Sequence, residues 1–294
     1  MHIIISGGGS AGAYARGILE YIWKHHPEIQ FEGGSGTSVG SLVLLPTMFG
    51  DYEGLCRFWD SVADHPEKVY KKKFLGYANL LWSDSIYDSQ PLLGMIFDYL
   101  KDKKIEQIKG WWRYYYVELT DTQLYFAWHT HSNLAKCILA SASMPGFFPA
   151  VHIDVDYPRS VDAGLRAVTP VDWVVNEEPA PKELLIIQCS TGESQRQEAK
   201  KLDKGLPVLL RSVSTLIDEV YEDDLTPFMI INEAVRQAKE DGQEFLRPNG
   251  VPYKYIKSIV LKQKRRYGDT LSFKKADLEQ MAQNGWYEAK ALWG

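Results

Sequence analysis

One short stretch of the chain has residue types and spacing suited to acyl-transfer chemistry. Residues 36–40 read Gly-Thr-Ser-Val-Gly, so that Ser38 is flanked by Gly36, Thr37, Val39 and Gly40. This is the pattern of a nucleophile elbow, a sharp turn from strand to helix that strains the serine backbone and exposes its hydroxyl. The same serine would also serve as an ordinary helix N-cap. The pattern predicts catalysis only if a base and an oxyanion hole accompany it.

A glycine-rich loop lies upstream, in Gly7-Gly8-Gly9-Ser10-Ala11-Gly12. It follows a short apolar stretch that predicts a buried strand, and it precedes a helical pattern. Consecutive glycines allow backbone N–H groups to converge on one oxyanion, and the helix N-terminus adds positive potential. The loop also fits the Gly-x-Gly-x-x-Gly fingerprint of NAD or FAD sites, because Glu32 lies 20 residues after Gly12. On this pattern alone, both interpretations stay open.

A candidate base for the serine is Asp162, in Val161-Asp162-Ala163-Gly164-Leu165. A carboxylate at a strand end, followed by a glycine turn, can point toward a neighbouring strand end from which an elbow emerges. The bland alternative is an Asx turn. None of the seven histidines lies in a segment with a clear triad signature.

The elements that would position these residues alternate between strands and helices. The first 50 residues predict a strand at 2–6, the glycine loop, a helix, a strand near Phe31, the elbow and a helix at 41–49. This is an α/β layout with a parallel pair of strands. We expect further helices at 52–62, 91–100, 133–142 and 278–293, with core-facing helical stripes at 206–220 and, in a next helix, 234–238. Strands are expected at 183–190 and 255–261, and hairpins at 111–131 and 151–162.

Bulk composition limits the function classes. The 294 residues include 33 Lys plus Arg and 38 Asp plus Glu, a net charge of −5 without a basic stripe, which argues against nucleic-acid binding. Three distant cysteines have no metal-ligand spacing and fit a reducing compartment. No apolar run approaches the ~18 residues of a spanning helix. We expect a soluble, cytoplasmic protein with at most peripheral membrane contact.

One segment could provide such contact. Lys71, Lys72 and Lys73 stand beside the apolar residues Phe74, Leu75, Tyr77, Leu80, Leu81 and Trp82. The pattern fits an interfacial patch for anionic lipid. We expect instead the simpler arrangement, a solvated turn followed by a core helix.

Taken together, the motifs resemble those of the patatin-like phospholipases. The resemblance rests on residues 5–14, 36–40, 141–149 (Ser-Ala-Ser-Met-Pro-Gly-Phe-Phe-Pro) and 161–165, with Thr169-Pro170-Val171 beyond, and its order and spacing cover roughly the first 190 residues. It implies a three-layer α/β fold in which helices flank a central mixed, mostly parallel sheet. Three positions depart from the family pattern: Ala11 replaces a frequent arginine, Ala163 a glycine and Val168 a common asparagine.

For function, the resemblance implies a Ser-Asp dyad, with Ser38 as nucleophile, Asp162 as base and Ala163 and Gly164 completing the base motif. The oxyanion hole would lie in the loop of Gly7, Gly8, Gly9, Ser10 and Gly12, and neither metal nor cofactor is required. The substrate would be a phospholipid or another lipid ester. We expect one domain over 1–294, with motifs in 1–190 and a helical part in 191–294. Two other functions remain: an NAD- or FAD-dependent oxidoreductase, and a catalytically silent scaffold.

Overall fold

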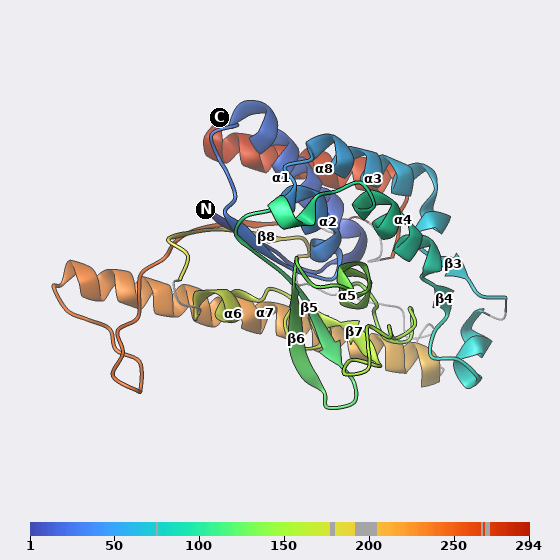
Figure 1. Ribbon diagram of the computed structural model, residues 1–294. Helices are drawn as coiled ribbons and strands as arrows, with labels where there is room; N and C mark the ends of the chain where they lie inside the picture. The colour runs from blue at the N-terminus through green and yellow to red at the C-terminus, as the bar shows by residue number, and fades with distance from the viewer. Residues whose placement is uncertain (75, 177–179, 192–204, 266, 268–270) are drawn as a thin grey trace.

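The computed structural model describes residues 1–74, 76–176, 180–191, 205–265, 267 and 271–294 (Figure 1). Within these residues the central sheet has seven strands, six of them in the order β6-β5-β2-β1-β8-β9, with β7 on β5. The strands are β1 (His2–Ile5), β2 (Gly33–Thr37), β5 (Trp111–Glu118), β6 (Gln123–Trp128), β7 (Ser160–Asp162), β8 (Glu183–Gln188) and β9 (Lys257–Lys262). The β1, β2, β5, β8 and β9 strands run parallel, and β6 and β7 pair antiparallel with β5. The predicted mixed, mostly parallel sheet is confirmed.

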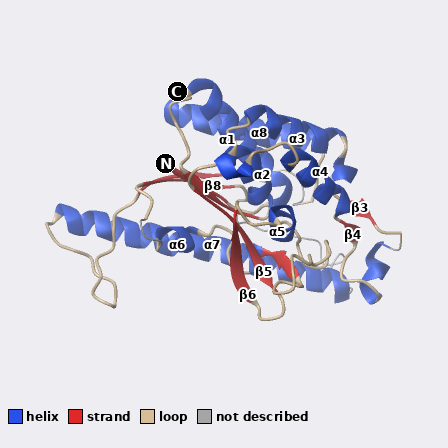
Figure 2. Ribbon diagram, in the orientation of Figure 1, coloured by secondary structure: helices blue, strands red, loops and turns tan. Residues whose placement is uncertain are grey.

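Helices cover both faces of this sheet (Figure 2). One layer contains α1 (Gly12–His25), α2 (Val39–Met48), α3 (Tyr52–Asp64), α4 (Gln90–Leu100), α5 (Leu134–Ser141) and α8 (Lys275–Trp293). The opposite layer contains α6 (Val171–Val175) and α7 (Gly205–Glu240). A two-stranded ribbon of β3 (Lys71–Lys72) and β4 (Tyr87–Asp88) lies apart from the sheet.

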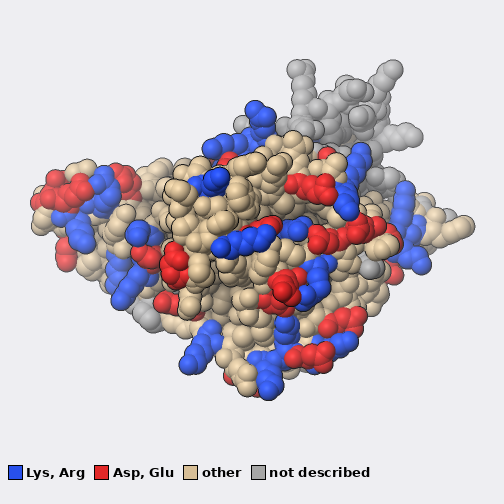
Figure 3. Space-filling view, turned by 90° about the horizontal axis from the view of Figure 1, so that it is seen from above, with Lys and Arg blue, Asp and Glu red and all other residues tan. Residues whose placement is uncertain are grey.

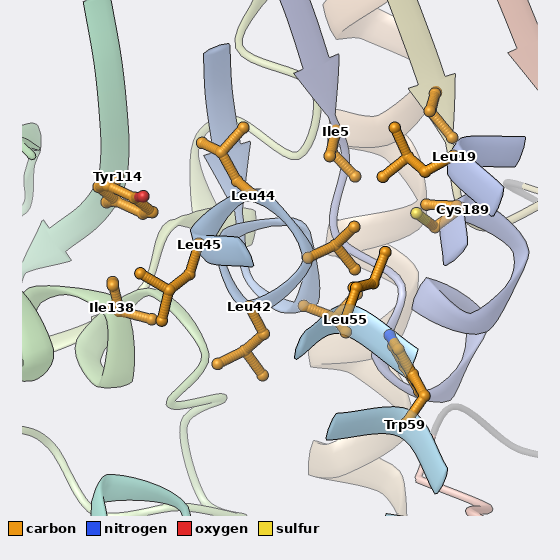
Figure 4. Packing of buried hydrophobic residues seen from close by; sticks show 14 of the residues in the cluster. Ile5, Leu19, Leu42, Leu44, Leu45, Leu55, Trp59, Tyr114, Ile138 and Cys189 are labelled. Atoms are coloured by element: carbon orange, nitrogen blue, oxygen red, sulfur yellow. The ribbon is translucent and has the colours of Figure 1, made fainter. Parts of the chain in front are cut away.

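The apolar central strands explain this layering. In β1, Ile3 and Ile5 join the core under α1 and α2, while Ile4 joins the smaller core under α6 and α7. Successive strand side chains point to opposite faces, so a continuous apolar run must be covered on both sides. Figure 4 shows the first core, where Leu44 and Leu45 of α2 lie beside Tyr114 of β5.

Two sequence expectations need correction. The apolar stripes at 206–220 and 234–238 belong to one helix, α7, which continues through Pro227. Tyr221, Phe228 and Val235, spaced by seven residues, are all buried, and Phe228 packs against β1 and β8, so buried side chains support the helix on both sides of the proline. Not every residue of the stripe faces the core, since Leu216 is 66% exposed; the side chains of Leu206, Leu209 and Leu210 lie outside the described residues.

Smaller differences concern the strands. The second strand begins at Gly33, beyond Phe31, and the expected hairpin at 151–162 is reduced to a single bridge between Val151 and Ser160, because β7 pairs with β5 instead. Cys137 and Cys189 are buried and Cys56 is partly buried, all as free thiols. No helix in the described ranges has the length and apolar character needed to cross a membrane.

Candidate active site

Strand β5 brings the two candidate reactive residues together. Its Tyr115 is aligned with Thr37, the last residue of β2, and its next residue, Tyr116, is aligned with Asp162, the last residue of β7. Since β2 and β7 follow one another along β5, Ser38 leaves the sheet beside Asp162. Residues 124 positions apart in sequence are thus neighbours because both are in register with one strand.

Ser38 has the strained backbone expected of an elbow. Its φ of 57° and ψ of −129° are outside the regions that L-residues prefer, and Thr122 is the other non-glycine residue with positive φ in the described part of the chain. Ser38 occupies the N-cap position of α2, but its side chain makes no capping bond. Gly40 permits the turn, because a Cβ there would lie 2.1 Å from the carbonyl oxygen of Ile5. The capping interpretation of Ser38 therefore fails for its side chain.

Two further serines hold the elbow, and their role was missed in the sequence. The Ser38 N–H donates to Ser141 Oγ at 3.0 Å, and the Ser41 hydroxyl donates to the Gly36 carbonyl at 2.9 Å. The Ser41 and Ser141 hydroxyls are 2.8 Å apart. This chain of bonds ties the end of α5 to the start of α2. The signal was present, since Ser141 opens one of the recognised motifs.

Asp162 is buried and lies beside the candidate nucleophile. Burial raises the pKa of its carboxyl to about 7, while hydrogen bonds with the Ser38 side chain and the Gly164 N–H limit the rise. The Gly164 N–H lies 2.8 Å from Asp162 Oδ1. Ala163 is absent from the described residues with positive φ, so the methyl group that replaces a glycine hydrogen is tolerated. The Asx-turn interpretation is correct for the Gly164 bond, and the carboxyl contacts Ser38 as well.

The glycine loop passes directly over Ser38. A Cβ on Gly7 would lie 3.1 Å from the Ser38 Cβ, so only a glycine allows this approach without displacement. Gly8 and Gly9 have φ of 152° and 59°, within the range that favours glycine. The Gly7 N–H is used internally, donating to the Val168 carbonyl at 3.1 Å.

The rest of the loop begins the helix. Buried Ser10 lies in a short 3₁₀ turn, Gly9–Ala11, and Gly12, the first residue of α1, donates its N–H to the carbonyls of Gly9 and Ser10. Among the described residues, the N–H groups of Gly8 and Gly9 have no acceptor in the protein. Within the glycine loop, these two amides are therefore available to bind a ligand.

A half-buried carboxylate in α7, which belongs to none of the sequence motifs, supports this loop from the other side of the sheet. Asp224 Oδ2 accepts a hydrogen bond from the Thr169 N–H at 2.6 Å, and the Val168 N–H also bonds to its carboxyl. Because the Val168 carbonyl in turn accepts from Gly7, Asp224 is linked to the glycine loop through one residue. Burial raises the pKa of Asp224 to about 7.

Ser38, Asp162 and the glycine loop open onto one pocket with largely apolar walls. Its lining includes Val39 of the elbow, and α7 contributes Ile217, Asp218 and Tyr221. The other apolar lining residues come from several elements: Leu42, Phe58, Trp59, Val62, Val69, Leu92, Met144, Phe148, Val168, Leu271 and Phe273. Such walls suit a hydrocarbon chain placed next to a serine hydroxyl.

Residues 3–174 match the family model described as Patatin-like phospholipase, which covers more than half of the chain. The chain belongs to the patatin-like phospholipase family. Members of this family are serine lipid hydrolases. The match ends within α6, so α7, β9 and α8 lie beyond the matched part of this family member.

Two further comparisons add little to the family assignment. Among solved structures, the patatin-like chain aligns with the crystal structure of VipD from Legionella pneumophila at a TM-score of 0.44 and 11% identity, covering 99% of this chain and 66% of that one. It thus spans about two thirds of the VipD chain, and a likeness of this degree says nothing of the chemistry. The comparison with curated proteins gives no match.

Family membership and geometry together argue against the dinucleotide interpretation. Strands β1 and β2 run parallel. The glycine loop follows the end of β1, whereas Glu32 comes just before the start of β2. Glu32 therefore lies at the opposite edge of the sheet from the loop, where it cannot reach a ribose bound there. In this patatin-like protein none of the seven histidines lines the pocket, and within the described residues no cluster of histidine, cysteine or acidic side chains could hold a metal ion.

Proposed function

We propose that the protein hydrolyses carboxylic esters of lipids with Ser38 as the nucleophile and Asp162 as the general base. The observation that carries this proposal is that Ser38 and the buried Asp162 carboxyl lie side by side at the ends of β2 and β7 and line the same largely apolar pocket. An ordinary aspartate, with a pKa near 3.9, is a poor base for a hydroxyl. A pKa of about 7 makes Asp162 a much better match for proton transfer near neutral pH.

The proposed reaction proceeds through an acyl-enzyme. Ser38 Oγ attacks the ester carbonyl carbon while Asp162 accepts the hydroxyl proton. Collapse of the tetrahedral intermediate breaks the bond to the alcohol, which leaves with the proton from Asp162. Water then attacks the acyl-enzyme, again losing a proton to Asp162, and the fatty acid departs as Ser38 Oγ regains the proton.

We assign the oxyanion hole to the Gly8 and Gly9 N–H groups. Their lack of an acceptor among the described residues supports this, as does the close approach of the loop to Ser38. Gly7 would shape the loop through its bond to Val168, and Ser10 and Gly12 would start the helix whose positive end faces the oxyanion. A donor of this kind typically contributes ~10²–10³ in rate.

The substrate we propose is a phospholipid or another lipid ester, whose acyl chain would occupy the apolar part of the pocket. An insoluble substrate requires contact with the surface that contains it. We therefore include peripheral contact with a lipid surface in the proposal.

The experiment that tests this function is labelling with a fluorophosphonate probe, followed by hydrolysis of phospholipids and of a soluble ester. Ser38→Ala should abolish labelling, Asp162→Asn should slow it strongly, and Ser132→Ala, at an exposed serine, should label like the wild type. Full labelling of Ser38→Ala would reject the proposal. Failure of the wild type to react with the probe and with every ester would favour the silent scaffold.

A further inference from the structure

Two large aromatic side chains project into solvent next to two lysines. Phe74 is 101% exposed and Trp82 is 75% exposed, so neither contributes to a core. Lys71 and Lys72 of β3 are also exposed. We call these four residues the aromatic tip. The expected core helix at this position is thus wrong for Phe74 and Trp82; Leu75 lies outside the described residues, as do the side chains of Tyr77 and Leu81.

The loop that carries the aromatic tip is braced from within. Lys73 Nζ donates to Ser83 Oγ at 2.7 Å and to Ser85 Oγ at 2.8 Å, and the Lys73 N–H bonds to the Ile86 carbonyl at 3.1 Å. The third lysine of the run therefore has an internal structural role. Lys71 and Lys72 are the members of the run that face outward.

The tip is attached to the wall of the pocket. The Tyr87 N–H of β4 bonds to the Phe147 carbonyl at 2.8 Å, and the Tyr87 ring lies 5.9 Å from that of Phe148, which lines the pocket. At the other end, pocket residue Val69 comes two positions before Lys71. A partner surface that binds the aromatic tip therefore lies next to the pocket.

The charge at the tip is positive, although the whole chain has a net charge of −5. Residues 71–83 contain three lysines and no acidic residue. Of the two acidic residues in 84–88, Asp84 is paired with Arg159 at 3.2 Å, and Asp88 is aligned with Lys71 in the β3–β4 ribbon. Figure 3 shows Lys or Arg side chains beside the uncharged projection at the right-hand end, where Figure 1 has β3 and β4, with Asp or Glu side chains further in. Exposed aromatic rings close to exposed lysines suit a membrane interface. The rings enter the head-group region, and the lysines attract anionic lipid.

We propose that the aromatic tip is the membrane-docking surface of this protein and that its partner is a bilayer containing anionic lipid. This inference rests on the proposed lipid hydrolase function, which requires the pocket to meet a lipid surface. Phe74 and Trp82 insert between head groups, and Lys71 and Lys72 supply the electrostatic attraction. Docking at this position brings lipid ester to the pocket side of the molecule.

The test measures vesicle binding in the Ser38→Ala background, so that lipid is not consumed. Vesicles of phosphatidylcholine with phosphatidylglycerol are compared with vesicles of phosphatidylcholine alone. Phe74→Ala with Trp82→Ala should weaken binding to the mixed vesicles roughly tenfold or more, because two aromatic side chains no longer leave water. Lys71→Gln with Lys72→Gln should cost about fivefold per lysine on mixed vesicles and almost nothing on phosphatidylcholine alone.

A matched charge control is Lys104→Gln with Lys109→Gln, two exposed lysines near the opposite edge of the sheet, which should not alter binding. When the tip substitutions are made in the chain that keeps Ser38, every variant should hydrolyse a soluble ester at the wild-type rate. This result would show that the variants fold. Unchanged vesicle binding by the aromatic variant would overturn docking at the tip. Docking would also be overturned if the variant lost self-association but kept its lipid binding, because the tip would then be a contact between copies of the chain. Neither result affects the hydrolase proposal, which depends on Ser38-dependent turnover of the soluble ester.

Discussion

Residues 3–174 and helix α7 line the same pocket but contribute to it in different ways. The first region supplies the groups proposed to react: Ser38, Asp162 and the glycine loop, each placed where a strand ends. Helix α7 supplies wall residues, Ile217 and Tyr221, and a half-buried carboxylate, Asp224, that bonds to backbone N–H groups of the first region.

This difference concerns how strongly each role restricts the sequence. An elbow needs particular backbone geometry, and therefore glycines at particular spacings. The wall of the pocket needs only apolar side chains of sufficient size. Support of the loop needs one hydrogen-bond acceptor at the right distance. Many sequences provide both. We therefore expect substitutions in the first region to slow the reaction by orders of magnitude, and substitutions in α7 to slow it much less.

The largest effect is expected for Asp162→Asn, which removes the proposed base while keeping a side chain of similar size. The rate constant kcat should fall roughly 10³–10⁴-fold, as for loss of a base that acts as a unit with its nucleophile. In the wild type, kcat/KM should fall about tenfold per unit of pH below 7, since the base works ionised and its pKa is about 7. A titration with this pKa lies within roughly pH 5–8. A kcat/KM that stays constant over that range would contradict the assignment of Asp162 as the base.

Asp162→Asn, which should lower activity, should raise the stability of the folded protein at neutral pH. The pKa of Asp162 is raised in the folded protein to about 7 from its ordinary value of 3.8, so the folded state holds a proton that the unfolded chain has lost. The stabilisation is complete below pH 3.8 and is lost as the pH rises through 7. Asp162→Asn should therefore gain stability over the wild type as pH rises, measured by urea unfolding. Asp224 adds a slope of the same sign, so the variant flattens the pH dependence without abolishing it.

An intermediate effect is expected for Gly40→Ala. The new Cβ would lie 2.1 Å from the Ile5 carbonyl oxygen, so α2 and the elbow must shift. Unfolding free energy should fall by about 2–4 kcal/mol, and probe labelling of Ser38 should slow by a factor on the order of 10². The matched control is Gly94→Ala, at an exposed position in α4 where a Cβ meets nothing within 4 Å. That change should stabilise the protein by about 0.5–1 kcal/mol and leave labelling unchanged.

Much of the first region could be predicted because its signals are local. Apolar runs such as Ile3-Ile4-Ile5 indicate buried strands, helical spacing identifies α1, and a longer apolar run after the elbow indicates the buried helix α2. Strand β2 was harder, since Gly33 and Gly34 have low strand propensity. Its glycines are required by packing, because a Cβ on Gly34 would lie 2.5 Å from a methyl carbon of Leu44. Only the folded neighbours show this.

The contacts that support the site could not be predicted, because each joins residues far apart in sequence. The Ser38 N–H meets Ser141 across 103 positions, and Asp224 meets Thr169 across 55. Nothing in a local pattern distinguishes Asp224 from its exposed neighbour Asp223. The continuous α7 was missed for a related reason: Pro227 suggests a break, and the buried stripe that maintains the helix depends on the sheet beneath it.

The smallest effect is expected at Asp224, which we regard as a positioning residue. Asp224→Asn keeps one acceptor oxygen but turns an NH₂ group toward one of the two backbone N–H groups at Val168 and Thr169. The Val168 carbonyl should then shift relative to the Gly7 N–H, and with it the loop proposed to hold the oxyanion.

Because the loop would act only on the transition state, kcat should fall about tenfold while KM stays nearly constant. Asp224→Glu, which restores the carboxylate on a longer arm, should recover part of kcat, and Asp223→Asn should behave as the wild type. The measurement is steady-state hydrolysis of a soluble ester, with thermal unfolding to compare stabilities. A loss of stability with kcat unchanged would limit Asp224 to holding α7 on the sheet, and the two regions would then be independent in catalysis.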